Sequence, residues 1–490
     1  MPRSSYKSFI FCPIALLAHS KCLAAFAVGL HLLRGVLLAQ QVGLAAGAEA
    51  TGVPASRGDP SAALHVQQQG LDRLHRAIDE AAARVMPKVI AYRRDFHQHP
   101  ELSNQEVRTA KIVADELRRL GIEVRTGVAH TGVVGVLRGG NPGGVVALRA
   151  DMDALPVTEE GDLPFKSTIR THYNGHEVGV MHACGHDAHT AMLLGAAEVL
   201  TAMKAELPGA VVFLFQPAEE GLPDGEVCGA ELMMKEGALD HPKVDAIFGL
   251  HVFHFESGEI RFRPGGFMAG YNDFKIRVQG HQTHGAMPWD GVDPIVVASQ
   301  IVLGLQTIIS RQIKLTTAPA IITIGSIQGG TRNNIIPNEV MMEGTIRTFD
   351  PEMRKQIHKR VNLTATSIAQ SAGATADVKI ENDAPITFND LNLTAKVTGS
   401  LRRVSVGRCD SNTPAVTISE DFSFYQQRVP GLFFFLGVTP KGTDPSTVAP
   451  NHSPKFFVDE GALITGVRAM ASLAVDYLAG ADDKLHAGSK

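Results

Sequence analysis

Short apolar runs that end in acidic or histidine side chains constrain the fold of this chain more than any other feature. The clearest runs, with the polar residues that follow them, are Val145–Ala150 with Asp151–Asp153, Val211–Phe215 with Gln216–Glu220, and Ala246–Leu250 with His251. Their branched and aromatic residues predict strands of a sheet covered on both faces. Helical patterns such as Thr190–Met203 separate several of them, which predicts an α/β fold. Because such sheets bind ligands beyond the carboxyl ends of their strands, we expect the polar residues to form a site there.

The densest group of candidate metal ligands is the segment Met181–His189, which reads M-H-A-C-G-H-D-A-H. It contributes five polar groups, namely His182, Cys184, His186, Asp187 and His189. A thiolate beside imidazoles and a carboxylate suits zinc, manganese, cobalt or nickel better than calcium or magnesium. The alternatives are a turn with one buried cysteine and solvated histidines, or a structural zinc turn. The further acidic and histidine residues at strand ends favour a catalytic metal site.

Length and charge narrow the class of protein. A chain of 490 residues predicts two domains. The formal net charge of -4, with 20% charged residues, provides no basic excess for nucleic acid, so we expect a small-molecule partner. Five cysteines without paired spacing do not indicate a disulfide framework.

The N-terminal segment differs in composition from the rest. Arg3 and Lys7 precede an apolar stretch, and Ala48-Glu49-Ala50 resembles a cleavage site. We therefore expect a signal-like segment over residues 1–50, a linker over residues 51–70, and export to the periplasm or the medium. The alternative is a mispredicted start and a cytoplasmic protein. No stable membrane span is expected in the mature chain, because no later segment approaches about 20 consecutive apolar residues.

A second domain is predicted within the first. Its strands and helices alternate as β-α-β-β-α-β, the order of a ferredoxin-like unit. The predicted elements are Phe274–Val278, Pro294–Gln312, Ile321–Ile327, Val340–Phe349, Pro351–Gln370 and Val378–Ile380. This α+β lid would occupy residues 267–384 and divide the catalytic domain into residues 71–266 and 385–480, with a tail over residues 481–490. The other elements expected in the catalytic domain are helices at Leu71–Val85, Asn104–Leu120 and Gly461–Leu478, and strands at Val133–Leu137 and Leu432–Leu436.

Nine short motifs occur in one order along the chain. They are R-A-D-M-D-A-L-P, M-H-A-C-G-H-D-A-H, Q-P-A-E-E-G, G-L-H-V, G-H-Q-T-H-G-A-M-P, N-N-I-I-P, G-T-I-R-T-F, S-E-D-F and N-H-S-P. Together they resemble the amidohydrolase branch of the M20 metallopeptidase family, which includes hippurate hydrolases, N-acyl-amino-acid hydrolases and indole-acetyl-amino-acid hydrolases. The resemblance covers Leu71 to Leu478. It implies a zinc-peptidase-like α/β catalytic domain, an inserted lid that often forms a homodimer, and a site for two divalent metal ions (Mn, Zn, Co or Ni).

The resemblance also implies roles for individual residues. The implied metal ligands are Cys184, His186, Glu220, His251 and His452. Glu219 would be the general base, and Asp153 would orient a ligand imidazole. In the lid, His284 would stabilise the oxyanion, often across the subunit interface, while Asn334 and Arg347 would hold the substrate carboxylate.

Two departures from the family pattern matter for the site and the substrate. Asp151 stands where peptidases of the wider family carry a histidine ligand, so the ligand set shifts towards Cys184 and His186. Residues Gly221–Cys228 are less glycine-rich than in the plant auxin-conjugate enzymes, which argues against an auxin conjugate as substrate. The expected reaction is metal-assisted hydrolysis of the amide of an N-acyl amino acid, such as hippurate. The alternatives are a metal-dependent exopeptidase or dipeptidase, and a catalytically silent ligand-binding protein.

Overall fold

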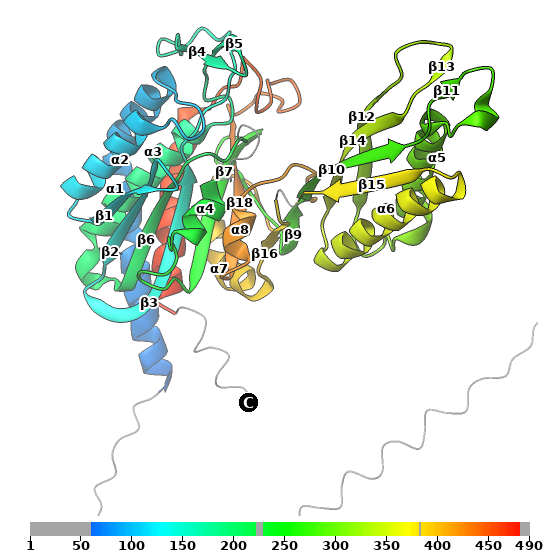
Figure 1. The fold of residues 1–490 in the computed structure, drawn as a ribbon. Helices are drawn as coiled ribbons and strands as arrows, with labels where there is room; N and C mark the ends of the chain where they lie inside the picture. The colour runs from blue at the N-terminus through cyan, green and yellow to red at the C-terminus, as the bar shows by residue number, and fades with distance from the viewer. Residues whose placement is uncertain (1–59, 222–228, 382–383, 481–490) are drawn as a thin grey trace, which may run out of the picture. The chain divides into compact units, whose positions relative to one another are not determined.

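The computed structural model describes residues 60–221, 229–381 and 384–480 (Figure 1). Four of the expected segments lie outside these residues: the signal-like segment, the first part of the linker, the C-terminal tail and nearly all of Gly221–Cys228. Within them, an eight-stranded sheet forms the catalytic domain and a separate four-stranded sheet forms the lid. The predicted α/β domain with a ferredoxin-like insertion is thus confirmed.

The eight-stranded sheet places the predicted strand ends side by side. Its strands, in spatial order, are β1 (Glu123–Val128), β2 (Gly132–Arg138), β6 (Pro208–Gln216), β3 (Asn141–Asp151), β7 (Ala246–Glu256), β18 (Gly431–Thr439), β8 (Ile260–Arg261) and β17 (Cys409–Asp410). Strands β6, β3, β7 and β18 run parallel to one another. In this register Asp151 pairs with Gln216, and His251 pairs with Phe435. The polar residues after each apolar run therefore meet at one edge of the sheet, as the sequence predicts.

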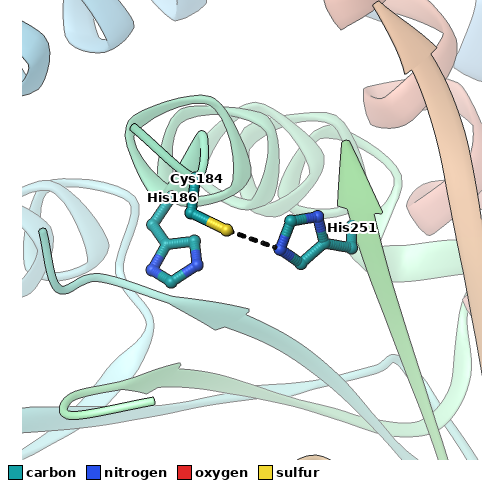
Figure 2. A group of neighbouring side chains, drawn as sticks. All are labelled: Cys184, His186 and His251. Carbon is teal, nitrogen blue, oxygen red and sulfur yellow. Dashed lines mark hydrogen bonds between the residues drawn. The ribbon is translucent and has the colours of Figure 1, made fainter. Parts of the chain in front are cut away.

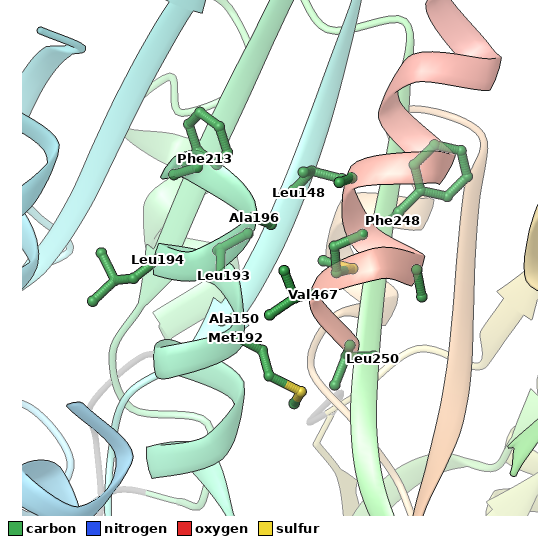
Figure 3. Close-up of a cluster of buried hydrophobic side chains, with 14 of the residues drawn as sticks. Leu148, Ala150, Met192, Leu193, Leu194, Ala196, Phe213, Phe248, Leu250 and Val467 are labelled. Carbon is green, nitrogen blue, oxygen red and sulfur yellow. The ribbon is translucent and has the colours of Figure 1, made fainter. Parts of the chain in front are cut away.

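Alternate residues of the central strands face two different cores. On β3 and β6, Leu148 and Phe213 belong to a core that also includes helices α3 (His186–Ala202) and α9 (Leu463–Leu478) (Figure 3). Their neighbours Ala147 and Leu214 pack on the opposite face of the sheet. That face is covered by α4 (Gly229–Lys235) and α8 (Ser423–Gln426). Burial on both faces explains why these strands appear as continuous apolar runs instead of alternating patterns.

The first helix is longer than the sequence pattern indicates. Helix α1 spans Pro60–Gln98, whereas the sequence predicts a helix over Leu71–Val85 and a linker up to residue 70. Pro87, which removes one backbone donor, lies inside the observed helix just beyond the predicted end. The helix continues because Val89 and Phe96 extend its apolar stripe into the core. Packing of this stripe therefore outweighs the local effect of the proline.

Helix α3 begins earlier than predicted, and this places the metal-type residues on it. The apolar pattern suggests a start at Thr190, but the helix begins at His186 directly after Gly185. Gly185 has a φ of 91°, and a Cβ atom there would lie 2.3 Å from Val252. Only glycine satisfies both the left-handed backbone and this close approach. The first turn of the helix is thus polar and directed towards the sheet edge.

The lid has the ferredoxin-like strand order. Its antiparallel sheet runs β12 (Ala320–Gly329), β14 (Glu339–Thr348), β10 (Gly270–Gln279) and β15 (Thr375–Ile380). Helices α5 (Pro294–Thr307) and α6 (Pro351–Ser371) share one apolar core with this sheet. The paired strands β9 (Gly265–Met268) and β16 (Thr387–Asn389) flank the insertion.

The remaining elements are shorter or more peripheral. They are α2 (Val107–Arg119), α7 (Leu391–Val404), the hairpin β4 (Arg170–Tyr173) and β5 (His176–Gly179), and the lid pair β11 (Thr283–His284) and β13 (Ile335–Ile336). Two helical segments, Pro294–Gln312 and Glu460–Leu478, have the length and mean hydropathy of a membrane span. The second is a core segment, since 78% of it is buried.

Candidate metal centre

Three predicted ligands converge at the carboxyl edge of the catalytic sheet. Cys184 precedes helix α3, His186 begins it, and His251 lies on β7 (Figure 2). One potential ligand atom from each lies within 4.8 Å of the others, and Sγ of Cys184 is 3.3 Å from Nε2 of His251. All three side chains are buried. A thiol and two imidazoles at this spacing are a donor set for a transition metal.

A second group of potential ligands shares Cys184 with the first. It adds Glu220 and His452, with Nε2 of His452 at 3.3 Å from both the Cys184 sulfur and a Glu220 oxygen. The structure therefore brings all five predicted ligands together as two groups. Nε2 of His186 and Oε1 of Glu220 are buried without a hydrogen-bond partner among the described residues. Unpaired buried acceptors of this kind fit divalent cations, so these residues can hold the two ions that the sequence predicts.

Two of the potential ligands, Cys184 and His251, have strongly shifted pKa values. Burial, together with Glu220 and Glu219, raises the pKa of the Cys184 thiol well above its usual range. Burial likewise lowers the pKa of His251 well below normal, which leaves a neutral imidazole. A thiolate in this site thus requires a positive charge beside it, and a bound divalent cation provides that charge.

Asp153 connects two of the ligands. Its Oδ1 lies 3.2 Å from Nδ1 of His186, and its backbone carbonyl lies 2.8 Å from the same nitrogen. Its Oδ2 accepts hydrogen bonds from the backbone N–H of Glu220 at 2.9 Å and from the Ser103 hydroxyl at 2.8 Å. With Nδ1 of His186 engaged in this way, Nε2 is the nitrogen left for a metal. This position suits the orienting role predicted for Asp153.

Glu219 lies beside the ligands without being needed as one. One of its oxygens is within 4.8 Å of ligand atoms of His186 and Glu220, and another grouping places it near Glu420 and Asp421. Burial is the main cause that raises the pKa of Glu219 well above its usual value, followed by repulsion from Glu420 and Glu220. A carboxylate with this raised proton affinity can take a proton from water at the edge of the metal groups.

A buried charge network behind the site was not anticipated from the sequence. The guanidinium of Arg149 is fully buried and donates hydrogen bonds to Asp151 at 2.6 Å, to Gln216 at 2.8 Å and to Glu420 at 2.9 Å. It also donates to Asp421 at 2.9 Å. An arginine within the apolar run Val145–Ala150 is the signal that could have revealed it, since such a strand is buried on both faces.

The same network engages Asp151, which stands where peptidases of the wider family carry a histidine ligand. Its Oδ1 lies 2.5 Å from Nδ1 of His189, and its other oxygen accepts from Arg149. The second ring nitrogen of His189 accepts the backbone N–H of Val252 at 2.8 Å. Both nitrogens of His189 are therefore engaged, although one lies within 4.8 Å of potential ligand atoms of Asp151 and His186.

The other polar residues of the M-H-A-C-G-H-D-A-H turn are also structural. Oδ2 of Asp187 contacts Nε of Arg93 at 3.0 Å and Nδ1 of His97 at 2.9 Å, and all three side chains are buried. Burial lowers the pKa of His182 to about 3. His182 is thus a neutral packing residue, and Asp187 is paired with Arg93 and His97.

The predicted lid residues do not lie within the two ligand groups. His284 and Asn334 are exposed on neighbouring lid segments, where the backbone carbonyl of Asn334 accepts from Gly285 at 2.8 Å. Arg347 stacks over Tyr271 with 4.1 Å between the guanidinium carbon and the ring centre, and it donates to Ser419 at 3.3 Å. Arg347 therefore contacts the segment that leads into Glu420, while the roles of all three lid residues stay predictions.

Comparisons with known proteins agree with this geometry. The model of peptidase family M20/M25/M40 matches residues 147–476. The chain is 43% identical to thermostable carboxypeptidase 2 of Saccharolobus solfataricus, over 79% of this chain and 95% of that protein. It is 38% identical to N-acetyl-L-cysteine deacetylase of Bacillus subtilis, over 77% of this chain and 85% of that protein.

A solved structure has the same architecture. The YXEP protein of Bacillus subtilis, described as a dinuclear metal-binding peptidase of the M20 family, superposes with a TM-score of 0.68 at 36% identity. The match covers 81% of this chain and 99% of that one. The ligand groups, the family model and the relatives at more than 30% identity lead to one conclusion: the chain belongs to peptidase family M20/M25/M40 and is a metal-dependent amidohydrolase.

Proposed function

We propose that the protein hydrolyses the amide bond of N-acyl amino acids to a carboxylic acid and a free amino acid. The observation that carries this proposal is the position of Glu219 beside two ligand groups that are complete without it. A spare carboxylate at a metal site is what hydrolysis requires of a general base. The 38% identity to an N-acetyl-L-cysteine deacetylase supports the substrate class.

In the proposed reaction Glu219 acts twice. It first accepts a proton from the attacking water and then donates it to the leaving amine, so that the catalytic residue is regenerated. Divalent cations held by Cys184, His186, His251, Glu220 and His452 would polarise the amide carbonyl and lower the pKa of nearby water towards neutrality. Asp153 keeps His186 in one tautomer while this occurs. Zinc and manganese are the ions we expect, because the donors combine a thiolate, imidazoles and a carboxylate.

The lid residues are proposed to bind the rest of the substrate. A planar guanidinium such as that of Arg347 pairs with a carboxylate through two parallel hydrogen bonds. His284 would donate to the developing oxyanion, where the loss of one donor costs about 100- to 1000-fold in rate. Asn334 would contribute a further polar contact to the substrate carboxylate.

A carboxypeptidase activity is the second candidate. The 43% identity to a thermostable carboxypeptidase favours it. Both reactions cleave an amide next to an amino acid that carries a free carboxylate, so they would use the same base and ligands. They differ in what the pocket accepts on the acyl side.

A substrate screen distinguishes the two candidates. Turnover would be measured with N-acetyl, N-benzoyl and indole-acetyl amino acids, and with dipeptides and N-blocked dipeptides, on protein of known metal content. Preference for simple acyl groups supports the amidohydrolase, while preference for peptides favours the carboxypeptidase. Glu219→Gln should keep its metal and lose nearly all turnover on every substrate. An active Glu219→Gln would remove Glu219 as the base, and a metal-loaded protein inert towards the whole panel would refute both candidates.

Two further proposals concern the oligomeric state of the protein and its export. The lid is proposed to form a homodimer, because apolar side chains of α5 and of the edge strand β12 are exposed, among them Leu303 at 71% and Ile327 at 55%. Residues 1–50 are proposed to direct export, on the strength of their basic start and apolar stretch. Sequencing the N-terminus of the purified protein tests the second proposal, and an intact start at Met1 would contradict it.

A further inference from the structure

A buried carboxylate from a distant segment contacts the backbone immediately before Glu219. Glu106 precedes helix α2 and is fully buried. Its Oε1 accepts the backbone N–H of Ala218 at 2.9 Å, and its Oε2 accepts the hydroxyl of Thr131 at 2.5 Å. The carbonyl of Ala218 accepts the backbone N–H of Gly229 at 3.0 Å. Both the backbone N–H and the backbone carbonyl of Ala218 are thus hydrogen-bonded.

Ala218 needs this support because of its backbone conformation. Its φ is +53°, in the left-handed region that residues with a Cβ rarely occupy. The turn at Ala218 redirects the chain from the end of β6 into Glu219 and Glu220. Without a bond that favours this conformation, an alanine would return to the common region and rotate the two carboxylates away from their positions.

The same distant segment also supports the other strand end. Ser103 donates to Asp153, and the backbone N–H of Ala154 donates to the carbonyl of Glu101 at 2.8 Å. Residues 101–106 therefore contact the ends of both β3 and β6. This segment contains none of the proposed ligands or catalytic groups, so its contacts act on the site only through other residues.

We propose that Glu106 is a positioning residue for Glu219, which it orients by fixing Ala218 in the left-handed conformation. The inference rests on the proposed function, because it assumes Glu219 as the base. The hydrogen bond from the backbone N–H of Ala218 depends on the length of the side chain at position 106. A side chain as long as glutamate that carries an acceptor oxygen preserves this hydrogen bond, whatever its charge. Burial and Asp153 raise the pKa of Glu106 to about 7, so a neutral glutamine is a mild replacement at this position.

The test compares Glu106→Gln, which keeps the length, with Glu106→Asp, which keeps the charge and shortens the reach. For Glu106→Asp, kcat should fall about 10- to 100-fold, the scale of a small misplacement of a catalytic group, with KM nearly unchanged and both metal ions retained. Glu106→Gln should stay within about 3-fold of wild type. Adding Ala218→Gly to Glu106→Asp should restore part of kcat, since glycine adopts positive φ without support.

The matched control is Asp245→Ala. The Asp245 carboxylate accepts the backbone N–H of Val145 at 2.7 Å, at the opposite end of β3 from the site. This variant should change kcat little, even if its melting temperature falls as much as that of Glu106→Asp. A kcat loss equal to that of Glu106→Asp would indicate a general stability effect and overturn the inference.

Three other results would overturn it. They are a normal kcat in Glu106→Asp, a loss in Glu106→Gln as large as in Glu106→Asp, and the absence of recovery on adding Ala218→Gly. Glu219→Gln is measured in parallel, so that a failure of Glu219 as the base can be told apart from a failure of Glu106 as its positioning residue. If Glu219→Gln is inactive while Glu106→Asp is normal, only the role of Glu106 fails. If Glu219→Gln is active, the proposed base fails, and the role of Glu106 fails with it.

Discussion

Asp153 holds the imidazole of His186 through two of its atoms, with the carboxylate at 3.2 Å and the backbone carbonyl at 2.8 Å from Nδ1. The other carboxylate oxygen holds the backbone of Glu220, a ligand from a different strand end. One aspartate thus fixes the relative position of two ligands that are 34 residues apart in the chain. The structure gives this carboxylate partners on both of its oxygens.

Replacing Asp153 with asparagine should weaken metal binding about 10- to 100-fold. The amide keeps an acceptor for His186 but turns an NH2 group towards the backbone N–H of Glu220, so two donors face each other. Metal titration followed by calorimetry measures the change. Asp115→Asn, an exposed substitution on α2, is the control. Equal affinities in the two variants would show that Asp153 does not orient the ligands.

Cys184→Ser should lose metal from both ligand groups, because the sulfur belongs to each of them. A serine hydroxyl is a far poorer ligand than a thiolate for zinc or manganese at neutral pH. Metal content per chain, measured by elemental analysis after dialysis, should fall well below that of the wild type. Cys409→Ser is the matched control, since Cys409 is the other free cysteine among the described residues. If Cys184→Ser retains as much metal as Cys409→Ser, the centre of the site lies elsewhere.

Arg149→Met should destabilise the fold by about 3–5 kcal/mol, because it leaves buried carboxylates without their cation. Urea denaturation of the metal-loaded protein measures the loss. Arg138→Met removes an exposed arginine of β2 that pairs with Glu123, and should lower the stability far less. Similar losses for the two variants would contradict the importance of the buried network.

Leu303→Glu should convert the proposed lid homodimer to a monomer. Leu303 is 71% exposed on α5, and a charge in a dimer interface would have to be buried without a partner. Sedimentation velocity over a range of concentrations measures the oligomeric state. Leu363→Glu, on the exposed surface of α6, is the control with a similar change in charge. A wild type that sediments as a monomer would refute the dimer, and a dimeric Leu303→Glu would place its interface elsewhere.

The sequence predicts the sheet and the ligands well because both depend on local patterns. The predicted runs ending at Ala150, Phe215 and Leu250 are strands in the structure, and the polar residues after them meet at one edge. Cys184, His186, Glu220, His251 and His452 lie together as the family resemblance implies. Parallel strands bring their carboxyl ends together whatever the sequence distance between them.

Contacts that depend on the folded arrangement are not visible in the sequence. Glu106 shows no local sign that it reaches Ala218, 112 residues later in the chain. The start of α3 at His186 is also missed, because its first turn is made of buried polar residues that carry no apolar period. In the sequence alone, Arg149 looks like a charged break in an apolar strand. Its three carboxylate partners are seen only in the structure.

The buried arginine has a consequence for how the sheet assembles. On β3, Arg149 points to the same face as Ala147, where its acidic partners lie, while Leu148 points into the core formed with α3 and α9. If β3 paired with β6 one residue out of step, every side chain of β3 would change faces. The guanidinium would then enter a hydrocarbon core with only Asp151 of its own strand beside it, while Gln216, Glu420 and Asp421 would lose their donor. Misaligned pairing would therefore cost three of the buried hydrogen-bond partners of Arg149, so this one side chain favours the observed alignment of β3 with β6.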